Sequence, residues 1–186
     1  MKKFELTNEF ITNMFGTKLF RIRALVEFGD VEAGELGGYV EKESNLGHDD
    51  NAWVYDNAWV YGDAQVSGDA LVYDNARVYG DAQVSGDARV YDNAWVCGDA
   101  RVCGNGDYAY AHGFGSVNRT TTFFRLKDGG VGVRCGCFYG TLAQFRDKIR
   151  ETHGESAIAE EYLDLAALME KRFRRTGNEQ KTEEES

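Results

Sequence analysis

The chain has 186 residues, with 22 glycines, no proline and a formal net charge of −10. This length fits one domain or two small ones, and an aromatic content of 13% argues against a disordered chain. The acidity argues against general binding to nucleic acid. No stretch approaches the roughly 18 apolar residues of a membrane span, and no apolar signal-peptide core follows the N-terminal lysines, so we expect a cytoplasmic protein without membrane contact.

The N-terminal segment, residues 1–51, is predicted to form a β cap. Residues 4–28 carry apolar runs rich in β-forming residues with a glycine between them, a pattern that is consistent with a hairpin. Val40 and Leu46 lie six residues apart, which is the spacing of the repeat that follows. We therefore expect an imperfect first coil here, which loses its register at the insertion 48–50.

Nine consecutive hexads run from Ala52 to Asn105, with alanine first and valine third in every one. Alanine and valine share one strand face, and the Gly, Asp and Asn residues that follow are typical of turns. A second period of 18 overlies the period of six, so three strands and three turns make one triangular coil. Because every strand pairs with the coils on both sides, proline is excluded.

This repeat resembles the hexapeptide-repeat left-handed β-helix, in which an aliphatic residue, three variable residues, a small residue and another variable residue recur. The resemblance implies a mainly β fold, with a left-handed parallel β-helix of three to four coils and its exit over residues 52–115. Hexapeptide β-helices commonly trimerise side by side, so the resemblance also implies a homo-oligomer. Many of them are acyltransferases that use a histidine base and an extended loop.

Residues 116–175 are predicted to form an α+β module that begins with a β-hairpin. Two β-rich runs, Thr120–Leu126 and Val131–Cys137, flank a Lys-Asp-Gly-Gly turn signal. Cys135 and Cys137 fall on one face of the second run, and we expect buried, reduced thiols there. A zinc site is disfavoured because the pair is C-x-C and no second pair follows at a zinc-like spacing.

Two helices are expected after this hairpin. Thr141 and Gln144 form a capping box for the first helix, and Gly154 ends it. The second is predicted over about residues 156–174 from its apolar stripe. Residues 176–186 are an acidic tail with little to bury, and we expect them to be disordered.

The solenoid positions that point outward form two aromatic faces and one polar face. Exposed Trp, Tyr and Arg side chains are typical of interfaces, so we predict self-association or ligand binding through the aromatic faces. Stacking between neighbouring rungs, or cover by the C-terminal helices, is the structural alternative. The predicted binding residues are Trp53, Tyr55, Trp59, Tyr61, Tyr73, Arg77, Tyr79, Arg89, Tyr91 and Trp95.

The turns carry aspartates that should align in columns at rung spacing. Such columns could imitate nucleic-acid phosphates or bind cations, but the simpler interpretation is hydrogen bonding to the turn backbone. We expect no metal and no cofactor. The columns are formed by Asp56, Asp63, Asp69, Asp74, Asp81, Asp87, Asp92 and Asp99.

The sequence disfavours catalysis. The three histidines, His48, His112 and His153, lie outside the nine hexads, and no hexad is interrupted by a loop. General acid–base catalysis needs a positioned titratable group. We therefore expect a non-catalytic protein, with an acyltransferase relative as the alternative and His48 as the least implausible base.

Residues 28–46, the hexads and residues 135–154 together resemble small phage and prophage proteins that are often labelled hexapeptide-repeat or "polymer-forming cytoskeletal". Phage accessory proteins of this size often antagonise host defence. The resemblance therefore implies a binding protein that inhibits bacterial antiviral defence, either through a host protein effector, as an anti-CRISPR does, or by sequestering a small nucleotide signal. A self-assembling scaffold is a further alternative. The basic residues suited to a nucleotide are Arg119, Arg125 and Arg134.

Overall fold

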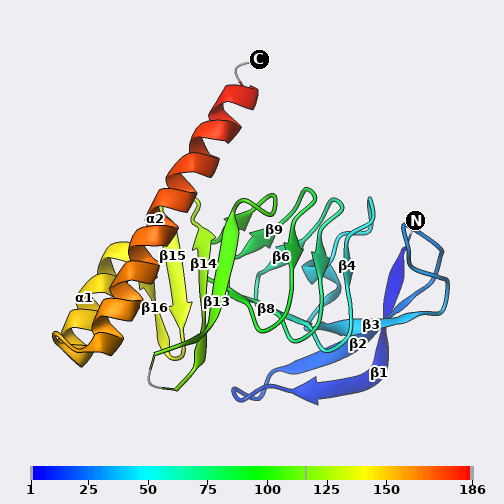
Figure 1. The fold of residues 1–186 in the computed structure, drawn as a ribbon. Coiled ribbons are helices and arrows are strands. Elements are labelled where there is room, and N and C mark those ends of the chain that lie inside the picture. Colours follow the sequence, from blue (N-terminus) through cyan, green and yellow to red (C-terminus); the bar gives the residue numbers. More distant parts are fainter. Residues whose placement is uncertain (1, 116, 185–186) are drawn as a thin grey trace. The chain divides into compact units, whose positions relative to one another are not determined.

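The computed structural model describes residues 2–115 and 117–184, with side chains as far as Thr176. The chain divides into two compact units, Met1–Asn105 and Gly106–Ser186. The first unit contains the cap and the hexads, and the second contains a four-stranded sheet and two helices (Figure 1). Neither helix, over its described residues, has an apolar stretch long enough to cross a bilayer.

The nine hexads form nine two-residue strands that stack in three parallel sheets. Strand partners are 18 residues apart, as in Trp53, Leu71 and Arg89. The alanine and valine of every hexad are fully buried, which confirms the repetitive β-solenoid interior. The strands are β4 (Trp53–Val54), β5 (Trp59–Val60), β6 (Gln65–Val66), β7 (Leu71–Val72), β8 (Arg77–Val78), β9 (Gln83–Val84), β10 (Arg89–Val90), β11 (Trp95–Val96) and β12 (Arg101–Val102).

Backbone hydrogen bonds between successive coils explain why the repeat lacks proline. The N–H groups of Trp53, Tyr55 and Asn57, which hold the second, fourth and sixth positions of one hexad, all donate to carbonyls of the next coil at 2.8–3.1 Å. A proline at any of these positions would remove one of the bonds. The fifth position is glycine or aspartate because the backbone there turns through positive φ in eight of the nine hexads.

The cap joins an antiparallel hairpin to the parallel coils. The strands β1 (Phe4–Thr12) and β2 (Lys18–Ala24) form the hairpin, and β3 (Leu36–Val40) pairs antiparallel with β2 and parallel with β5 (Figure 1). A 3-10 turn, η1 (Glu43–Asn45), then leads to a bridge between Leu46 and Val66. This bridge joins residues 20 positions apart instead of 18, so the insertion predicted at residues 48–50 lengthens the coil by two residues. The imperfect first coil is therefore present.

Gly38 shows how closely this first coil packs on the next. A Cβ atom at Gly38 would lie 2.7 Å from the carbonyl oxygen of Ala58 and 2.8 Å from a Val54 methyl group. Neither neighbour can move without disturbing the solenoid interior. Glycine is therefore required here by close approach.

The second unit is an antiparallel sheet in the order β13 (Tyr108–Phe114), β14 (Arg119–Arg125), β15 (Val131–Cys135) and β16 (Phe138–Thr141). The predicted hairpin is present as β14 and β15. The segment expected to be an irregular exit forms β13 instead. The run expected to continue to Cys137 stops at Cys135, because the chain turns back at Gly136 into β16.

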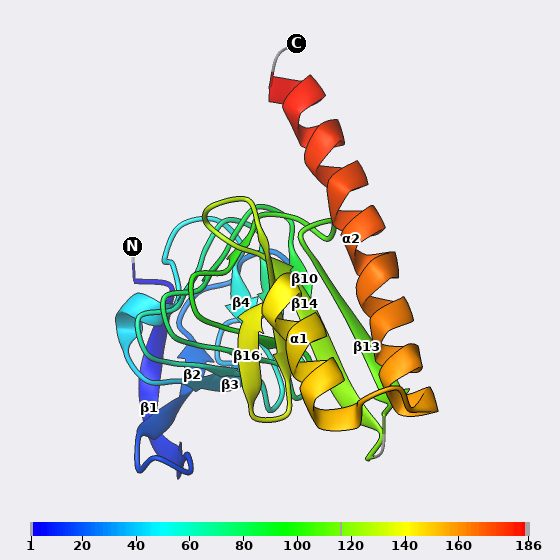
Figure 2. The same ribbon diagram turned by 90° about the vertical axis from the view of Figure 1, so that its left-hand side faces the viewer.

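Two helices, α1 (Leu142–His153) and α2 (Ala157–Glu184), lie on one side of this sheet (Figure 2). The capping box predicted at Thr141 is formed, and Gly154 ends α1 with φ +58°. The tail that was expected to be disordered continues α2 to Glu184, since Glu, Gln and Lys favour helix. Residues 185–186 lie outside the described part of the chain. The core of this unit is formed by Phe123, Val133, Leu142, Phe145, Ile149, Ala159, Tyr162, Leu165, Ala166, Met169 and Phe173.

Candidate functional site

Five side chains lie in register across one sheet, and we call them the arginine–aromatic row; Tyr39 is buried and the other four are half-buried. The strands β2, β3, β5, β8 and β11 pair in that order, so that Arg21, Tyr39, Trp59, Arg77 and Trp95 are neighbours in register. The Arg21 guanidinium lies 5.3 Å from the centre of the Tyr39 ring and donates a 3.0 Å hydrogen bond to its hydroxyl. The row therefore places two arginines among three aromatic rings across cap and solenoid, with Tyr39 and Trp59 side by side.

Arg77 is stacked between two indoles. Its guanidinium carbon lies 4.1 Å from the centre of the Trp59 ring and 4.7 Å from that of Trp95, and all three side chains are half-buried. Among the residues that the structure describes, none accepts a hydrogen bond from Arg77 or pairs with its charge. The guanidinium carbon thus lies over both indole rings, and its N–H donors remain for an outside acceptor.

Two tyrosines extend this surface beside the row. The rings of Tyr61 and Tyr79 stack in parallel, with centres 5.0 Å apart, and Tyr79 meets Trp95 edge-on at 6.4 Å. Cys97 follows in the same column and is buried. The stacking favours this arrangement of the rings.

Contrary to the prediction, Trp53, the first residue of the second aromatic face, does not lie on the surface. Its side chain is 0% exposed because the cap covers it. Phe4 and Phe28 both contact the indole edge-on, at 6.2 and 5.3 Å between ring centres. The indole N–H is buried without a hydrogen-bond partner among the described residues. The Trp53 side chain therefore packs between the cap and the solenoid and does not belong to the predicted binding surface.

The rest of this second face stays accessible. Tyr73 and Tyr91 stack with ring centres 5.1 Å apart, and burial together with the neighbouring Tyr91 raises the pKa of Tyr73. Burial also raises the pKa of Tyr55, which is half-buried. Arg89 is exposed and, unlike Arg77, has no indole in the strands paired with it.

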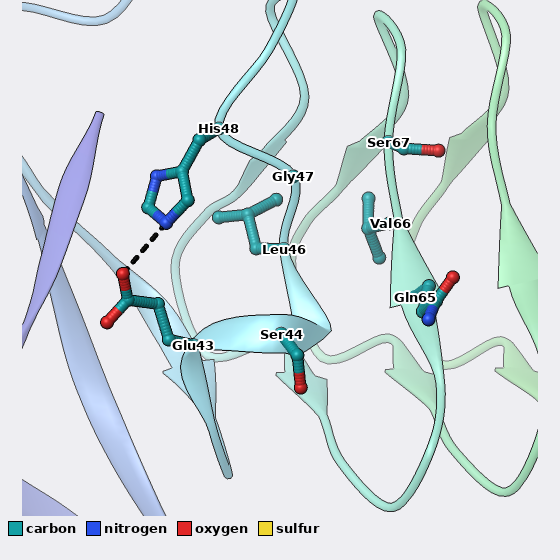
Figure 3. A pocket seen from close by; sticks show the side chains of 8 residues that line it. All are labelled: Glu43, Ser44, Leu46, Gly47, His48, Gln65, Val66 and Ser67. Atoms are coloured by element: carbon teal, nitrogen blue, oxygen red, sulfur yellow. Dashed lines mark hydrogen bonds and ion pairs between the residues drawn. The ribbon is translucent and has the colours of Figure 1, made fainter. Parts of the chain in front are cut away.

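A pocket of about 370 Å³ lies between the first coil and β6, with His48 and Glu43 at one end (Figure 3). Nδ1 of His48 accepts the backbone N–H of Lys3 at 3.1 Å, and Nε2 lies 2.9 Å from the Glu43 carboxylate. Since Nδ1 is the acceptor, Nε2 carries the proton and donates. The ring also stacks on Phe4 at 4.6 Å. Both ring nitrogens of His48 are thus engaged, Nδ1 with Lys3 beside β1 and Nε2 with Glu43 of the first coil.

The other two histidines lie in the second unit, and each contacts a neighbouring side chain. Nδ1 of His112 lies 2.9 Å from the Thr120 hydroxyl, and the His153 ring stacks on Tyr162 at 6.1 Å. Within the described residues, no group of three or more His, Cys, Asp or Glu side chains could hold a metal ion.

The aspartate columns are aligned as predicted, and their contacts are with the turns. Asp56, Asp74 and Asp92 have φ of 51–58°, and the side chains of the first two accept the backbone N–H of the next aspartate in the column at 3.4 and 3.2 Å. Asp63 instead pairs with Lys42 at 2.7 Å, which lowers the pKa of its carboxyl. Asp69, Asp81, Asp87 and Asp99 complete the columns and are exposed. Mimicry of nucleic acid stays the less favoured alternative for these columns.

The three arginines proposed for a nucleotide are not brought together. Arg119 and Arg125 stand six residues apart on β14, about 20 Å along the strand. Arg134 pairs with Thr122, so it projects from the opposite face of the sheet. Arg125 is also committed, because it pairs with the buried Asp107 at 3.1 Å and donates to the Phe173 carbonyl and the Thr176 hydroxyl.

The tip of the β1–β2 hairpin is an exposed apolar feature that sequence reasoning missed. Met14 and Phe15 are 86% and 80% exposed there, beside the turn at Gly16. The only available signal was two large apolar residues next to a turn glycine. Arg21 and Tyr39 were missed for a different reason, since only the register of β2 and β3 places them in the row.

Comparison with known families supports the fold. Residues 52–68, 64–80 and 82–98 match the family model described as YdcK beta solenoid repeat. A comparison with curated proteins found no match. The family match lies within the hexads. It supports the solenoid fold and indicates no activity.

Proposed function

We propose that this protein is a non-catalytic binding protein that recognises a partner protein through the arginine–aromatic row. The observation that carries the proposal is the stacked Arg77, whose N–H edge is left without an acceptor. Trp, Tyr and Arg dominate binding hot spots, and a guanidinium held in one plane is suited to a carboxylate. The two indoles on either side of Arg77 limit the orientations that its guanidinium can adopt.

The charge of the first unit indicates what surrounds that carboxylate on the partner. Residues 1–105 contain nine Lys and Arg against 18 Asp and Glu. This acidic unit attracts a basic surface, whereas Arg77 accepts a single acidic group at the centre of one face. The partner that fits is a basic protein surface with one carboxylate at its centre.

The acyltransferase alternative receives less support from the geometry. A histidine base needs a ring nitrogen that is free to take a proton from substrate. Both nitrogens of His48 are engaged, with Lys3 and with Glu43. A nucleotide bound jointly by Arg119, Arg125 and Arg134 is likewise disfavoured, because these side chains lie apart.

The resemblance to phage and prophage hexapeptide-repeat proteins supplies a biological setting for this proposal. In that setting the partner is a host defence effector with a basic surface, and the protein is its cytoplasmic inhibitor. Homo-oligomerisation, with a trimer as the expected form, stays a separate prediction. Light scattering tests it, because Tyr73→Glu combined with Tyr79→Glu should convert oligomers into monomers.

The binding proposal is tested by affinity capture with matched baits. The full chain is immobilised as wild type, Arg77→Ala and Arg89→Ala, where Arg89 occupies the same hexad position on another face. We expect at least one bacterial protein to be retained by wild type and Arg89→Ala and lost with Arg77→Ala. Identical retention by all three baits would contradict the proposed surface, and acetyl-CoA turnover that depends on His48 would contradict the non-catalytic assignment.

A further inference from the structure

Cys135 and Cys137 flank a tight turn instead of lying along one strand. Cys135 pairs with Phe138, so Gly136 and Cys137 form a two-residue loop between β15 and β16. Gly136 has φ +57° and Cys137 does not have positive φ, which fits a type II′ turn with glycine first. The expectation of two buried thiols is therefore wrong for Cys137, which is exposed, while Cys135 is half-buried.

The turn brings the two cysteines within disulfide range. Consecutive Cα atoms are about 3.8 Å apart, so the reversal of the chain over this two-residue turn leaves the Cα atoms of Cys135 and Cys137 roughly 5–7 Å apart. Disulfides span about 4.4–6.8 Å between Cα atoms. A glycine between the cysteines also leaves the backbone freedom to adjust as the sulfurs approach.

The surroundings of the turn are polar and positively charged. The Thr121 hydroxyl donates to Cys135 Sγ at 3.2 Å, and the Tyr162 hydroxyl lies 3.9 Å from the same sulfur. The Arg119 guanidinium packs against Gly136, where a Cβ atom would collide with it. Reactive cysteines are typically found in electropositive, partly exposed sites of this kind.

We propose that Cys135 and Cys137 form a reversible disulfide across Gly136 when the protein meets a two-electron oxidant such as hydrogen peroxide. Each thiol gives up a proton and an electron, and the S–S bond forms as the O–O bond of peroxide breaks. Two water molecules are released. A dithiol such as dithiothreitol reverses the step by exchange and is itself oxidised.

The two solenoid cysteines provide an internal control. Cys97 is buried and Cys103 is exposed, and they lie on different strands, six residues apart. Neither has a tight turn that joins it to a second thiol. We expect both to stay reduced under conditions that oxidise the C-terminal pair, so that Cys103 can be alkylated in the folded chain and Cys97 once the chain is unfolded.

The test uses the folded full chain, exposed to hydrogen peroxide, alkylated with iodoacetamide and digested with trypsin. Cleavage after Arg134 and Arg146 releases both cysteines on one peptide, residues 135–146. We expect this peptide to be about 2 Da lighter than its dithiol form and to carry no alkyl group, in wild type and in Cys97→Ser/Cys103→Ser alike. Dithiothreitol should restore two alkylation sites.

A second measurement distinguishes an effect of the positive charge beside the turn from an effect of solvent exposure alone. Arg119→Gln should slow disulfide formation about fivefold, because the positive charge beside the turn is lost, whereas Arg150→Gln on α1 should leave the rate unchanged. Two alkyl groups on peptide 135–146 after peroxide, or dimers linked through Cys137, would overturn the proposal. Equal rates in the two arginine variants would overturn the assigned role of Arg119.

Discussion

The two units of this protein build their interiors in opposite ways. Every coil of the solenoid buries the same two small side chains, alanine and valine, and each strand is only two residues long. The second unit buries single large side chains such as Phe123, Phe145 and Phe173, whose positions occur once. The solenoid is thus held together by contacts between identical neighbours, and the second unit by contacts that no other part of the chain repeats.

This difference determines how far the loss of stability caused by a single substitution should extend along the chain. In a repeat array each coil depends mainly on the coils next to it, so a defect at the centre removes support on both sides. In the second unit a lost aromatic side chain leaves a cavity that the surrounding residues can partly fill. Substitutions in the two units should therefore have separable effects.

The largest expected effect is that of Val78→Asp in the middle coil. A carboxylate in the alanine and valine interior has no partner, and we expect the free energy of unfolding of the first unit to fall by more than about 4 kcal/mol. Hydrogen exchange followed by mass spectrometry should show loss of protection in residues 1–105 and little change in the second unit. Phe123→Ala should give the reverse pattern, at a cost of about 3–5 kcal/mol. Equal loss in both units for either variant would contradict separate interiors.

Where the cap meets the solenoid, the packing depends on single aromatic contacts, as it does in the second unit. Trp53→Ala should destabilise the first unit by about 3 kcal/mol, whereas Trp59→Ala, at the same hexad position but half-buried, should cost about 1 kcal/mol. Urea unfolding measures both. Trp53→Phe is the matched control and should cost less than Trp53→Ala, since it keeps ring contacts and removes the unpaired indole N–H. Equal costs for the two alanine variants would argue against the cap contact.

The stability of the two units should respond to alkaline pH in different pH ranges. Burial lowers the pKa of Lys3 to about 8, so its ammonium is disfavoured in the fold. As the pH rises from 8 to about 10, folded Lys3 loses its proton before unfolded Lys3 does, and the first unit gains stability. Burial, with Cys135 nearby, raises the pKa of Tyr162 to about 12. The second unit therefore keeps its full stability below about pH 10 and loses stability between about 10 and 12.

Urea unfolding at several pH values, followed by hydrogen exchange in each unit, measures these two trends. Lys3→Met should remove the gain in the first unit, and Tyr162→Phe should remove the loss in the second. Parallel pH profiles in the two units would contradict the assignment.

The smallest expected change in stability lies on the outer surface of the solenoid. Arg77→Lys keeps the charge but loses the planar stack between Trp59 and Trp95, and should cost about 1 kcal/mol. Arg89→Lys should cost about zero because no indole flanks that arginine. Thermal unfolding of the two variants beside wild type measures the difference, and matching midpoints would argue against a stacked guanidinium.

The same contrast explains what the sequence could predict. The alanine and valine of each hexad predict the solenoid interior, and the turn signals predict the hairpins at Gly16 and Gly129. The position of Trp53 could not be predicted, because its hexad has the same first four residues as that of Trp59 and only the cap distinguishes their surroundings. Local patterns repeat along the chain, whereas cover by a distant segment leaves no local signal.

The candidate site shows the same limit. The outward Arg77 and its flanking tryptophans follow from the 18-residue period alone, so this part of the row was predictable. The extension to Arg21 and Tyr39 depends on how an antiparallel hairpin joins a parallel coil, a register that no short motif specifies. The turn at Gly136 was missed because the preceding alternation, Val133 and Cys135, continues to Cys137 in sequence but not in space.

The central proposal is tested most directly by calorimetric titration of the captured partner into wild type, Arg77→Lys and Arg89→Lys. If Arg77 contacts a carboxylate through its planar N–H edge, Arg77→Lys should weaken binding at least about tenfold, and Arg89→Lys should stay within about twofold of wild type. Equal affinities for all three proteins, or equal losses in both variants, would contradict a binding surface centred on Arg77.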